Sequence, residues 1–446
     1  MAKPKKSQDM MSLLVALCKR RGIVFPSSEI YGGVGSTYDY GPYGVEMKNN
    51  IAKLWWNEMT LNHDNIVGLD SAVILHPKVW ESSGHLKNFT DPMVDCKSCK
   101  ARFKADDVDL RPEKSVCPRC GNRDTFTEVR QFNMMFKTNI GPVESEGSTG
   151  YFRPETAQGI YLDWKLVQET ARLKLPFGIA QIGKAFRNEI TPGNFIFRTR
   201  EFEQMEMQFF VKPGESAKWM DYWRERRVGW LHSLGVRKEK IRWHQHPADK
   251  LAHYAREAWD IEYEFPFGWN EIEGIHDRTD FDLMAHQEGS GKDMTWFEPE
   301  TKERFLPHIV ETSAGLNRTM LVVLCDAYRE DEQAGEKRVY LSLDPRIAPI
   351  KAAVLPLVKK DGLAELAKSL ADDLRGKWQI FLDIQGSIGR RYRRMDELGT
   401  PFALTLDYQT KDDNTVTVRM RDTLAQERIG MDRVGAFLHD KLSPEA

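Results

Sequence analysis

Two closely spaced cysteine pairs are the first residues in the sequence whose type and spacing could do chemistry. Cys96 and Cys99 are separated by two residues, as are Cys117 and Cys120, and 17 residues lie between the pairs. Two cysteines at this spacing can hold one ion from a tight turn, and two such turns supply the four thiolates of a tetrahedral zinc site. Because sulfur would fill every position around the ion, the expected zinc is structural. The alternative is two chance pairs of reduced thiols.

Basic side chains surround the cysteine pairs, and two interpretations of them stay open. They would suit contact with a phosphate backbone, and they would equally suit a solvated surface. These residues are Lys97, Lys100, Arg102, Lys104, Arg119 and Arg123.

A second chemical group lies around a predicted hairpin that begins with Phe186-Arg187-Asn188-Glu189 and returns through Glu206. Guanidinium groups bind phosphates and carboxylates, an aromatic ring can stack on a purine, and carboxylates bind an ammonium or a metal. The alternative is a ladder of cross-strand salt bridges on a solvent face. We expect Arg187 and Glu189 on the outgoing strand to face the return strand. The return-strand residues expected on one face, by the strand period of two, are Arg198, Arg200, Phe202, Gln204 and Glu206.

Helices and strands with recognisable periods must position these residues. An extended segment over residues 66–75 ends before Pro77, and residues 265–283 are expected to form strands and loops. Apolar residues at helical spacing predict helices over residues 10–21, 44–61, 213–262 and 314–328.

The period changes after a highly charged stretch at residues 329–337, which we take as a domain boundary. Strands and helices alternate beyond it, which is typical of a layered α/β domain. Strands are predicted over residues 354–358, 379–384, 402–406 and 415–420, and helices over residues 363–374, 389–398 and 434–442.

Composition excludes several classes of protein. The chain has 446 residues, of which 41% are hydrophobic, so it can form large cores and is neither disordered nor fibrous. A formal net charge of −2 excludes a generally basic nucleic-acid coat. The longest apolar run, Met320 to Cys325, is too short to span a membrane, and no apolar region follows the basic start of the chain. We expect a cytoplasmic protein without a secretory signal.

The hairpin residues resemble the second signature of class II aminoacyl-tRNA synthetases. Gly315-Leu316-Asn317-Arg318 resembles their third signature, and the helix and strand before Pro77 resemble the first. Further motifs are similar to those of glycyl-tRNA synthetases of the homodimeric type, and the likeness extends from Met10 to Leu442. These motifs are Tyr38-Asp39-Tyr40-Gly41-Pro42, Trp80-Glu81-Ser82-Ser83-Gly84-His85, Arg153-Pro154-Glu155-Thr156-Ala157-Gln158-Gly159, Glu271-x-Glu273-Gly274 and Glu311-Thr312-Ser313-Ala314-Gly315.

The resemblance implies an α+β fold in two domains. Residues 1–340 would form an antiparallel-sheet catalytic domain, with a zinc-ribbon insertion at 91–129 and a helical segment at 213–262. Residues 341–446 would form an α/β anticodon-binding domain. It also implies glycine, ATP with Mg²⁺ and tRNA(Gly) as partners, and a homodimer, for which the helix around Trp55 and Trp56 would supply apolar surface.

The resemblance also implies roles for individual residues. Arg187, Glu189 and Arg318 would be catalytic, and Glu271 and Glu311 would hold Mg²⁺. The residues expected to bind ATP are Arg187, Asn188, Glu189, Phe197, Arg198, Phe202, Glu271, Ile272, Gly315 and Arg318. Those expected around glycine are Glu155, Gln204, Glu206, Glu311, Ser313 and Lys104, the last standing where many relatives have arginine.

Three other interpretations compete with this one. Another class II synthetase would share the signatures but not the acid-rich pocket. A non-catalytic tRNA-binding paralogue is expected to lack an arginine or acid of the signatures. A zinc-ribbon nucleic-acid-binding protein would leave most of the chain without a role.

In the C-terminal part, the arginines of the helix at 389–398 could contact a tRNA backbone, or could pair with Asp396, Glu397 and neighbouring acids.

Overall fold

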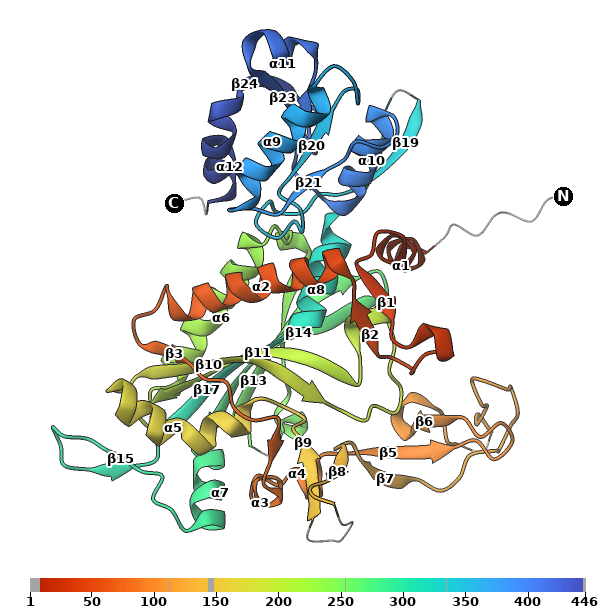
Figure 1. Cartoon of the computed structure of the whole chain (residues 1–446). Helices are drawn as coiled ribbons and strands as arrows, with labels where there is room; N and C mark the ends of the chain where they lie inside the picture. The colour runs from red at the N-terminus through yellow and green to blue at the C-terminus, as the bar shows by residue number, and fades with distance from the viewer. Residues whose placement is uncertain (1–8, 112, 143–147, 253, 334, 444–446) are drawn as a thin grey trace.

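The computed structural model of the protein describes residues 9–443, except residues 112, 143–147, 253 and 334. The basic start of the chain lies outside these residues. The largest element is a seven-stranded sheet with the order β12-β13-β14-β17-β11-β10-β3 (Figure 1). Its neighbouring strands are antiparallel except β10 and β3, which are parallel. The strands are β3 (Ile66–Gly68), β10 (Phe177–Phe186), β11 (Glu201–Val211), β12 (Ile241–Gln245), β13 (Glu257–Phe265), β14 (Gly268–Thr279) and β17 (His308–Gly315).

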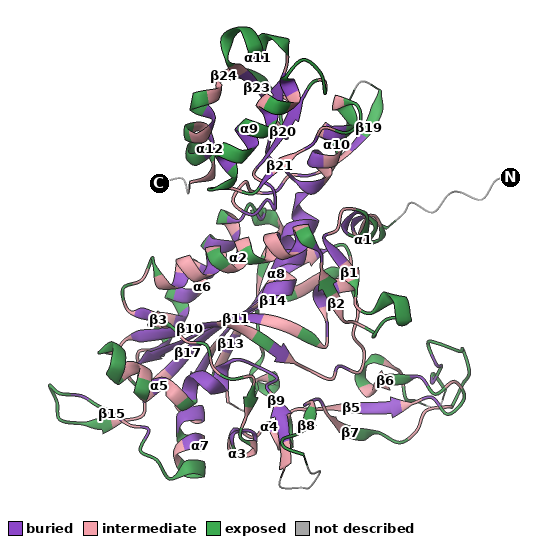
Figure 2. Ribbon diagram, viewed as in Figure 1, coloured by how far each residue is buried: buried purple, intermediate pink, exposed green. Residues whose placement is uncertain are grey.

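Helices cover both faces of this sheet, and Figure 2 shows its central strands as mostly buried. Three helices share one hydrophobic core with the first face, and two share a separate core with the second. The first three are α2 (Pro42–Thr60), α6 (Ser216–Ser233) and α8 (Leu316–Ala327), and the other two are α5 (Ala157–Ala171) and α7 (Phe281–Ser290).

Helix α2 follows the predicted apolar period closely. Met47, Ile51, Trp55 and Met59 recur every fourth residue, and all four side chains are fully buried. Trp56, beside them, packs partly buried against the same core. The expectation that Trp55 offers surface for a dimer is therefore wrong, because its ring fills the core of its own chain.

The predicted helical segment at 213–262 is only half correct. Helix α6 ends at Ser233, and the rest contains strands β12 and β13 of the large sheet. Trp259, Ile261 and Tyr263 alternate along β13, which is the strand period, and they pack against the main core. The apolar residues Leu251, Tyr254 and Ala258 fall at helical spacing across a loop and a strand, so the spacing alone was misleading.

Smaller sheets lie beside the large one. Residues 90–133, which include the predicted zinc ribbon and are called the insertion below, contain a three-stranded sheet with the order β6-β5-β7, and a second small sheet has the order β4-β9-β8. Figure 1 shows both below the large sheet, with the insertion projecting to the right. Their strands are β4 (Ile74–Leu75), β5 (Thr90–Asp95), β6 (Arg102–Lys104), β7 (Arg130–Asn133), β8 (Lys137–Asn139) and β9 (Thr149–Phe152). Two short helices, α3 (Pro77–Ser82) and α4 (His85–Asn88), lie beside them. The hairpin of β15 (Trp296–Phe297) and β16 (Arg304–Phe305) lies apart from these sheets, beside α5 at the left of Figure 1.

The N-terminal helix and hairpin lie beside α2. Helix α1 (Met10–Arg20) ends before Gly22, whose φ of +69° is the left-handed conformation that glycine adopts without strain. Strands β1 (Val24–Pro26) and β2 (Tyr38–Tyr40) pair antiparallel after it.

The C-terminal part forms a five-stranded sheet with the order β21-β20-β22-β23-β24. Strand β20 is parallel to both of its neighbours, and the remaining pairs are antiparallel. Helices α9 and α12 share a core on one face, and α10 packs on the other. The elements are β20 (Ala352–Pro356), α9 (Leu363–Arg375), β21 (Ile380–Leu382), α10 (Ile388–Leu398), β22 (Phe402–Leu406), α11 (Tyr408–Asp413), β23 (Thr415–Met420), β24 (Gln426–Gly430) and α12 (Val434–Leu442).

The charged boundary stretch forms an antiparallel hairpin, β18 (Tyr328–Gln333) and β19 (Glu336–Leu341). This hairpin packs on α10. Arg338 of β19 is buried and pairs with Asp396 of α10, which also pairs with Arg419 of β23. The stretch therefore fixes the C-terminal part in place instead of serving as a loose linker.

Two arginines of α10 pair with acids, although not with Asp396 or Glu397. Arg394 pairs with Asp383 and Arg393 pairs with Glu336, while Arg391 is buried and donates to backbone carbonyls. Arg390 is exposed, and no ion pair involves it within the described residues.

In the described part of the chain, no helix is both long and apolar enough to cross a membrane.

Candidate active site

A pocket lies on the sheet face that carries α5 and α7, over strands β11, β14 and β17. The period of two along β11 places Phe202, Gln204 and Glu206 in this pocket, while Met205 and Met207 fall in the core on the opposite face. Strand β17 does the same with Glu311, Ser313 and Gly315. The residues that face the pocket can be polar because the alternate residues of the same strands supply the apolar side chains of the core on the opposite face.

Strand β14 contributes through a β-bulge. Glu271 and Glu273 would share a face in a regular strand, but the register shifts between the partners of Glu271 and Glu273 on β13. Glu271 lines the pocket. Glu273 lies on the other face, where it is buried in an ion pair with Arg227 of α6 at 2.5 Å. The bulge therefore separates two acids that the sequence places together.

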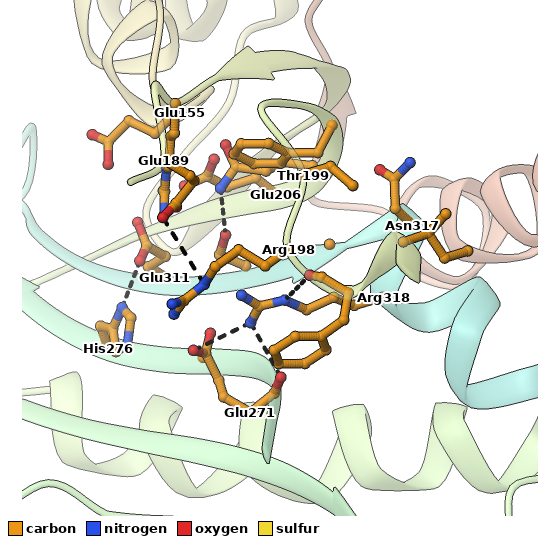
Figure 3. Close-up of a pocket in the computed structure, with 18 of the residues that line it drawn as sticks. Glu155, Glu189, Arg198, Thr199, Glu206, Glu271, His276, Glu311, Asn317 and Arg318 are labelled. Carbon is orange, nitrogen blue, oxygen red and sulfur yellow. Dashed lines mark hydrogen bonds and ion pairs between the residues drawn. The ribbon is translucent and has the colours of Figure 1, made fainter. Parts of the chain in front are cut away.

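The pocket has two chemically different ends (Figure 3). Carboxylates of Glu155, Glu206 and Glu311 gather at one end with His276, and the guanidiniums of Arg198 and Arg318 lie toward the other with Glu271. The residues lining it are Glu155, Arg187, Glu189, Ile196, Phe197, Arg198, Thr199, Phe202, Gln204, Glu206, Tyr254, Glu271, Gly274, His276, Glu311, Ser313, Gly315, Asn317 and Arg318.

Arg278 contacts several acids at the carboxylate end of the pocket. Its guanidinium is buried, donates to Glu311 at 2.8 Å and to Asp282 at 2.8 and 3.0 Å, and lies 3.9 Å from Glu155. The ring of Tyr254, which lines the pocket, lies over it at 3.7 Å. Five donors in a planar fork can bind one carboxylate through two hydrogen bonds and still reach others, whereas a lysine has three donors and no fork.

Glu155 and Glu311 are held ionised by cationic partners. Burial acts to raise the pKa of each carboxyl, and nearby positive groups outweigh it. For Glu311, Arg278 and His276 lower the pKa to about 2, and His276 lies at 2.6 Å. For Glu155, His85 at 3.3 Å and Arg278 lower the pKa. The pKa of His276 is raised by its bond to Glu311 despite its burial.

Glu206 differs from these acids, because its hydrogen-bond partners are neutral. It is 1% exposed, and its oxygens accept from the hydroxyl of Thr156 and from the amide of Gln208 at 3.0 Å. Within the described part of the chain, no lysine, arginine or histidine nitrogen lies within 4.0 Å of its carboxylate. Burial, reinforced by the charges of Glu311 and Glu155, raises the pKa of Glu206 well above its usual value.

The arginine end is more open. Arg318 donates to the carbonyls of Phe197 and Glu271, each at 3.1 Å, and its guanidinium lies over the Phe197 ring at 4.4 Å. Arg187 donates to the carbonyl of Pro154 at 3.0 Å, which places its guanidinium next to the residue that precedes Glu155. It therefore lies between the two ends of the pocket.

Most predicted site residues meet in this pocket, but four do not. Lys104 lies on β6 in the insertion and pairs with Asp91 at 2.5 Å. The side chain of Ile272 is buried in the main core, and Asn188 does not line the pocket. Arg200, expected on the same face as Phe202, donates instead to backbone carbonyls of Gly35 and Glu189.

Sequence analysis missed several residues of the site. Their positions come from the three-dimensional arrangement, although His85, Thr156 and Asn317 stand inside motifs already quoted, and Arg278 follows on the strand that carries Glu271. The missed residues are His85, Thr156, Gln208, Tyr254, His276, Arg278, Asp282 and Asn317.

Glu311 is a poor candidate for Mg²⁺, because His276, Gln208 and Arg278 form hydrogen bonds with both of its oxygens.

The four paired cysteines form a separate cluster in the insertion. All four sulfur atoms lie within 4.8 Å of one another, and none forms a disulfide. Cys96 and Cys120 are 3.8 Å apart, and Cys99 and Cys117 are 3.7 Å apart. A tetrahedron of thiolates with zinc–sulfur bonds of about 2.3 Å has sulfur–sulfur edges of about 3.8 Å. The donor set and its spacing therefore fit zinc.

Similarities to known proteins agree with this arrangement. An antiparallel sheet with arginines and carboxylates at opposite ends of one pocket is the organisation expected of a class II aminoacyl-tRNA synthetase. Residues 351–441 match the family described as "Anticodon binding domain".

Relatives that match over nearly their full length identify the family within this class. Glycine–tRNA ligase of Treponema denticola is 56% identical over 94% of both chains. Glycine–tRNA ligase of Streptomyces coelicolor is 52% identical over 97% of this chain and 99% of its own length. That of Caldanaerobacter subterraneus subsp. tengcongensis is 51% identical over 97% and 98%. The chain belongs to the glycine–tRNA ligase family.

Proposed function

We propose that this chain activates glycine with ATP to form glycyl-adenylate and pyrophosphate, and then transfers glycine to the 3′ end of tRNA(Gly). The observation that carries the proposal is the two-ended pocket. One end offers carboxylates for an ammonium, and the other offers guanidiniums for phosphates. Glycine has an ammonium and a carboxylate but no side chain, so it matches a pocket lined by charge.

Arg187 is the residue that connects the two substrates. Its guanidinium lies beside the Glu155 segment, so it can bind the carboxylate of a glycine whose ammonium faces the acids. The same group can contact the α-phosphate of ATP. A glycine oxygen then attacks the α-phosphorus, the bond to the bridging oxygen breaks, and pyrophosphate leaves. Catalysis here consists of positioning and charge neutralisation, without a protein nucleophile.

The remaining arginine-end residues have roles in ATP binding. Phe202 stacks on one face of adenine, and Arg318 covers the other face and reaches the γ-phosphate. Arg198 adds a phosphate contact, with Glu189 at 4.0 Å from its guanidinium. Glu271, whose side chain is about half exposed, is the acid we propose for Mg²⁺, which would neutralise phosphate charge when bound.

Selection of glycine follows from the shape and charge of the carboxylate end. Glu155, Glu206 and Glu311, with Ser313 and Gln204, leave no apolar lining for a larger side chain. Steric exclusion of larger amino acids does not depend on the weak discrimination of a missing methylene, about 1–3 kcal/mol.

Three further features belong to the same proposal. Cys96, Cys99, Cys117 and Cys120 hold a structural zinc ion in a ribbon within residues 91–129. Residues 1–340 and 341–446 act as catalytic and anticodon-binding domains, the second supported by the family match over 351–441. The chain works as a homodimer, as its family likeness suggests, and sedimentation at micromolar concentration would test this.

The deciding experiment is exchange of labelled pyrophosphate into ATP, run with each of the twenty amino acids. We expect exchange with glycine alone. Exchange with a different amino acid would identify another class II synthetase, and absence of exchange with all twenty would identify a non-catalytic paralogue.

A further inference from the structure

The carboxylate end of the pocket has an excess of acids over cations. Glu155, Glu311 and Asp282 share Arg278 and the histidines His85 and His276. Glu206 is a fourth acid in the same buried space, and its hydrogen-bond donors carry no charge. An ionised Glu206 would therefore be a buried charge without a partner, which is strongly unfavourable.

The amide of Gln208 shows how closely Glu206 and Glu311 are held. Tyr161 donates to the Oε1 of Gln208 at 2.7 Å, which fixes the orientation of the amide. The two N–H groups of Gln208 then reach Glu206 at 3.0 Å and Glu311 at 2.8 Å. Two carboxylates bridged by one neutral amide repel each other, and only Glu311 has cations of its own to offset this repulsion.

We propose that Glu206 is protonated while the glycine site is empty and loses its proton when an ammonium group binds, so that glycine binding releases a proton. This inference rests on the proposed function. The ammonium supplies the missing positive charge and replaces the proton: the neutral carboxyl and the zwitterion form a carboxylate–ammonium pair, and one proton passes to solvent. The buried geometry and the raised pKa of Glu206 agree in direction.

Several charged or titratable groups around Glu206 are alternative sources of the released proton. Arg153 acts on Glu206 through its charge, but its guanidinium donates to the carbonyls of Lys184 and Ser71. His276 is the strongest rival, because its bond with Glu311 raises its pKa and so favours the protonated form, whose charge an incoming ammonium would oppose. These groups are Arg153, Glu155 and Tyr161 around α5, Glu311 on β17, His276 and Arg278 on β14, Asp282 on α7, His85 on α4 and Tyr254 before β13.

The sign of the pH dependence follows directly. A proton and the ammonium compete for the same carboxylate, so glycine binds more weakly at low pH. Below the pKa of Glu206 in the empty site, the dissociation constant should rise about tenfold for each pH unit lost, and above that pKa it should become constant.

Titration calorimetry with glycine alone tests the proposal. At pH of about 6 and about 7, the heat is measured in phosphate and in bis-Tris, whose ionisation enthalpies differ, so the difference gives the protons released per glycine. We expect release approaching one proton from the natural chain. Glu201→Gln, on the same strand but exposed and paired with Lys184, should behave identically.

Glu206→Gln is the critical variant, because glutamine resembles the protonated acid. We expect it to release no proton, and its glycine affinity should be weaker and independent of pH. Equal heats in both buffers for the natural chain would overturn the inference, and so would undiminished release from Glu206→Gln, which would assign the proton to His276 or another group. If Glu206→Gln binds too weakly to measure, His276→Gln decides: proton release retained in that variant supports Glu206, and its loss assigns the proton to His276. Absence of both glycine binding and glycine-dependent exchange would instead reject the proposed function.

Discussion

At the scale of single residues, the pocket is defined by which partner each charged group has. Arginines at one end contact backbone carbonyls and rings, so their guanidiniums can exchange those contacts for phosphate oxygens. Acids at the other end are largely satisfied by Arg278 and two histidines. This asymmetry gives each end a different response to substitution.

Replacing Arg187 with alanine should remove adenylate formation and leave the fold intact. The side chain lines the pocket, and among the described residues its guanidinium donates to the carbonyl of Pro154 and lies over the rings of Phe89 and Phe202, so little structural support is lost. Loss of one preorganised donor to a developing charge costs about 10²–10³-fold in rate, and this arginine serves two substrates. Pyrophosphate exchange measures the effect. Arg187→Lys, which keeps the charge without the fork, should retain more activity; exchange close to normal in the alanine variant would remove the hairpin from the active site.

The carboxylate end predicts a pH-dependent stability in the ligand-free protein. The raised pKa of Glu206 means that the folded state binds more protons than the unfolded state above the ordinary carboxyl range, so this group lowers stability progressively as pH rises. Glu311, whose pKa falls to about 2, acts in the opposite sense: its contribution is present above about pH 4.3 and is lost as pH falls toward 2.

Glu206→Gln should therefore raise the melting temperature of the empty protein, and by more at pH 8 than at pH 5. One pKa unit corresponds to about 1.4 kcal/mol, so a gain of a few degrees is expected at the upper end. Circular dichroism melts across this range measure it. A variant that melts lower than the natural chain at every pH would mean that Glu206 is ionised and contributes to folding.

At the scale of elements, periodicity predicted several strands and helices whose apolar residues pack into one core. The strands at 402–406 and 415–420 and the helix at 434–442 have the predicted bounds, because their apolar residues pack into one core. The helical prediction for 213–262 failed after Ser233, since alternating aromatic residues on β13 obey the other period. Short α11 and β24 were missed because they bury few residues.

The candidate site was predictable only where a motif states the spacing. The motifs name Glu155, Arg187, Glu206 and Glu311, and the fold brings them together. Arg278 could not be found in this way, because its role depends on three acids from separate segments. Likewise, a strand period assigned Arg200 to the pocket, but the strand begins one residue later.

The cysteine cluster belongs to the insertion, and its metal can be tested there. The purified, reduced chain should carry about one zinc ion. Cys117→Ser removes one ligand of the set and should lower the zinc content and loosen the insertion. Elemental analysis measures the metal, and Cys18→Ser is the matched control, because Cys18 is buried in helix α1 away from the cluster. Protein free of zinc when prepared without chelators would contradict the assignment.

At the scale of the whole molecule, α10 joins the C-terminal part to the rest of the chain. Asp396 binds Arg338 of the β18–β19 hairpin, and its neighbour Glu397 binds Arg20 and Arg21 beside α1. Figure 1 shows α10 facing α1 across this junction. The exposed Arg390 lies in the hollow between them, with Arg21 also lining it.

Arg390→Glu should weaken tRNA charging without affecting pyrophosphate exchange, because exchange requires no tRNA. Loss of one phosphate contact should raise the Michaelis constant for tRNA several-fold and reduce its salt dependence by about one ion. Arg433→Glu is the matched control, since Arg433 is exposed beside α12 on the other face of the C-terminal sheet. Equal effects of both substitutions would indicate a general charge effect and not a contact at α10.

The bulge in β14 has a consequence for how this stretch of chain can change over evolutionary time. Three consecutive residues serve two faces of one sheet: Glu271 opens to the pocket, and Glu273 is locked to Arg227 behind it. Substitutions at Ile272 need only preserve a buried apolar side chain. If the strand became regular with all three residues kept, the two carboxylates would share one face: either Glu273 would enter the pocket and leave Arg227 without its anion, or Glu271 would leave the pocket. The stretch is therefore more constrained in the shape of its backbone than in the side chain at Ile272.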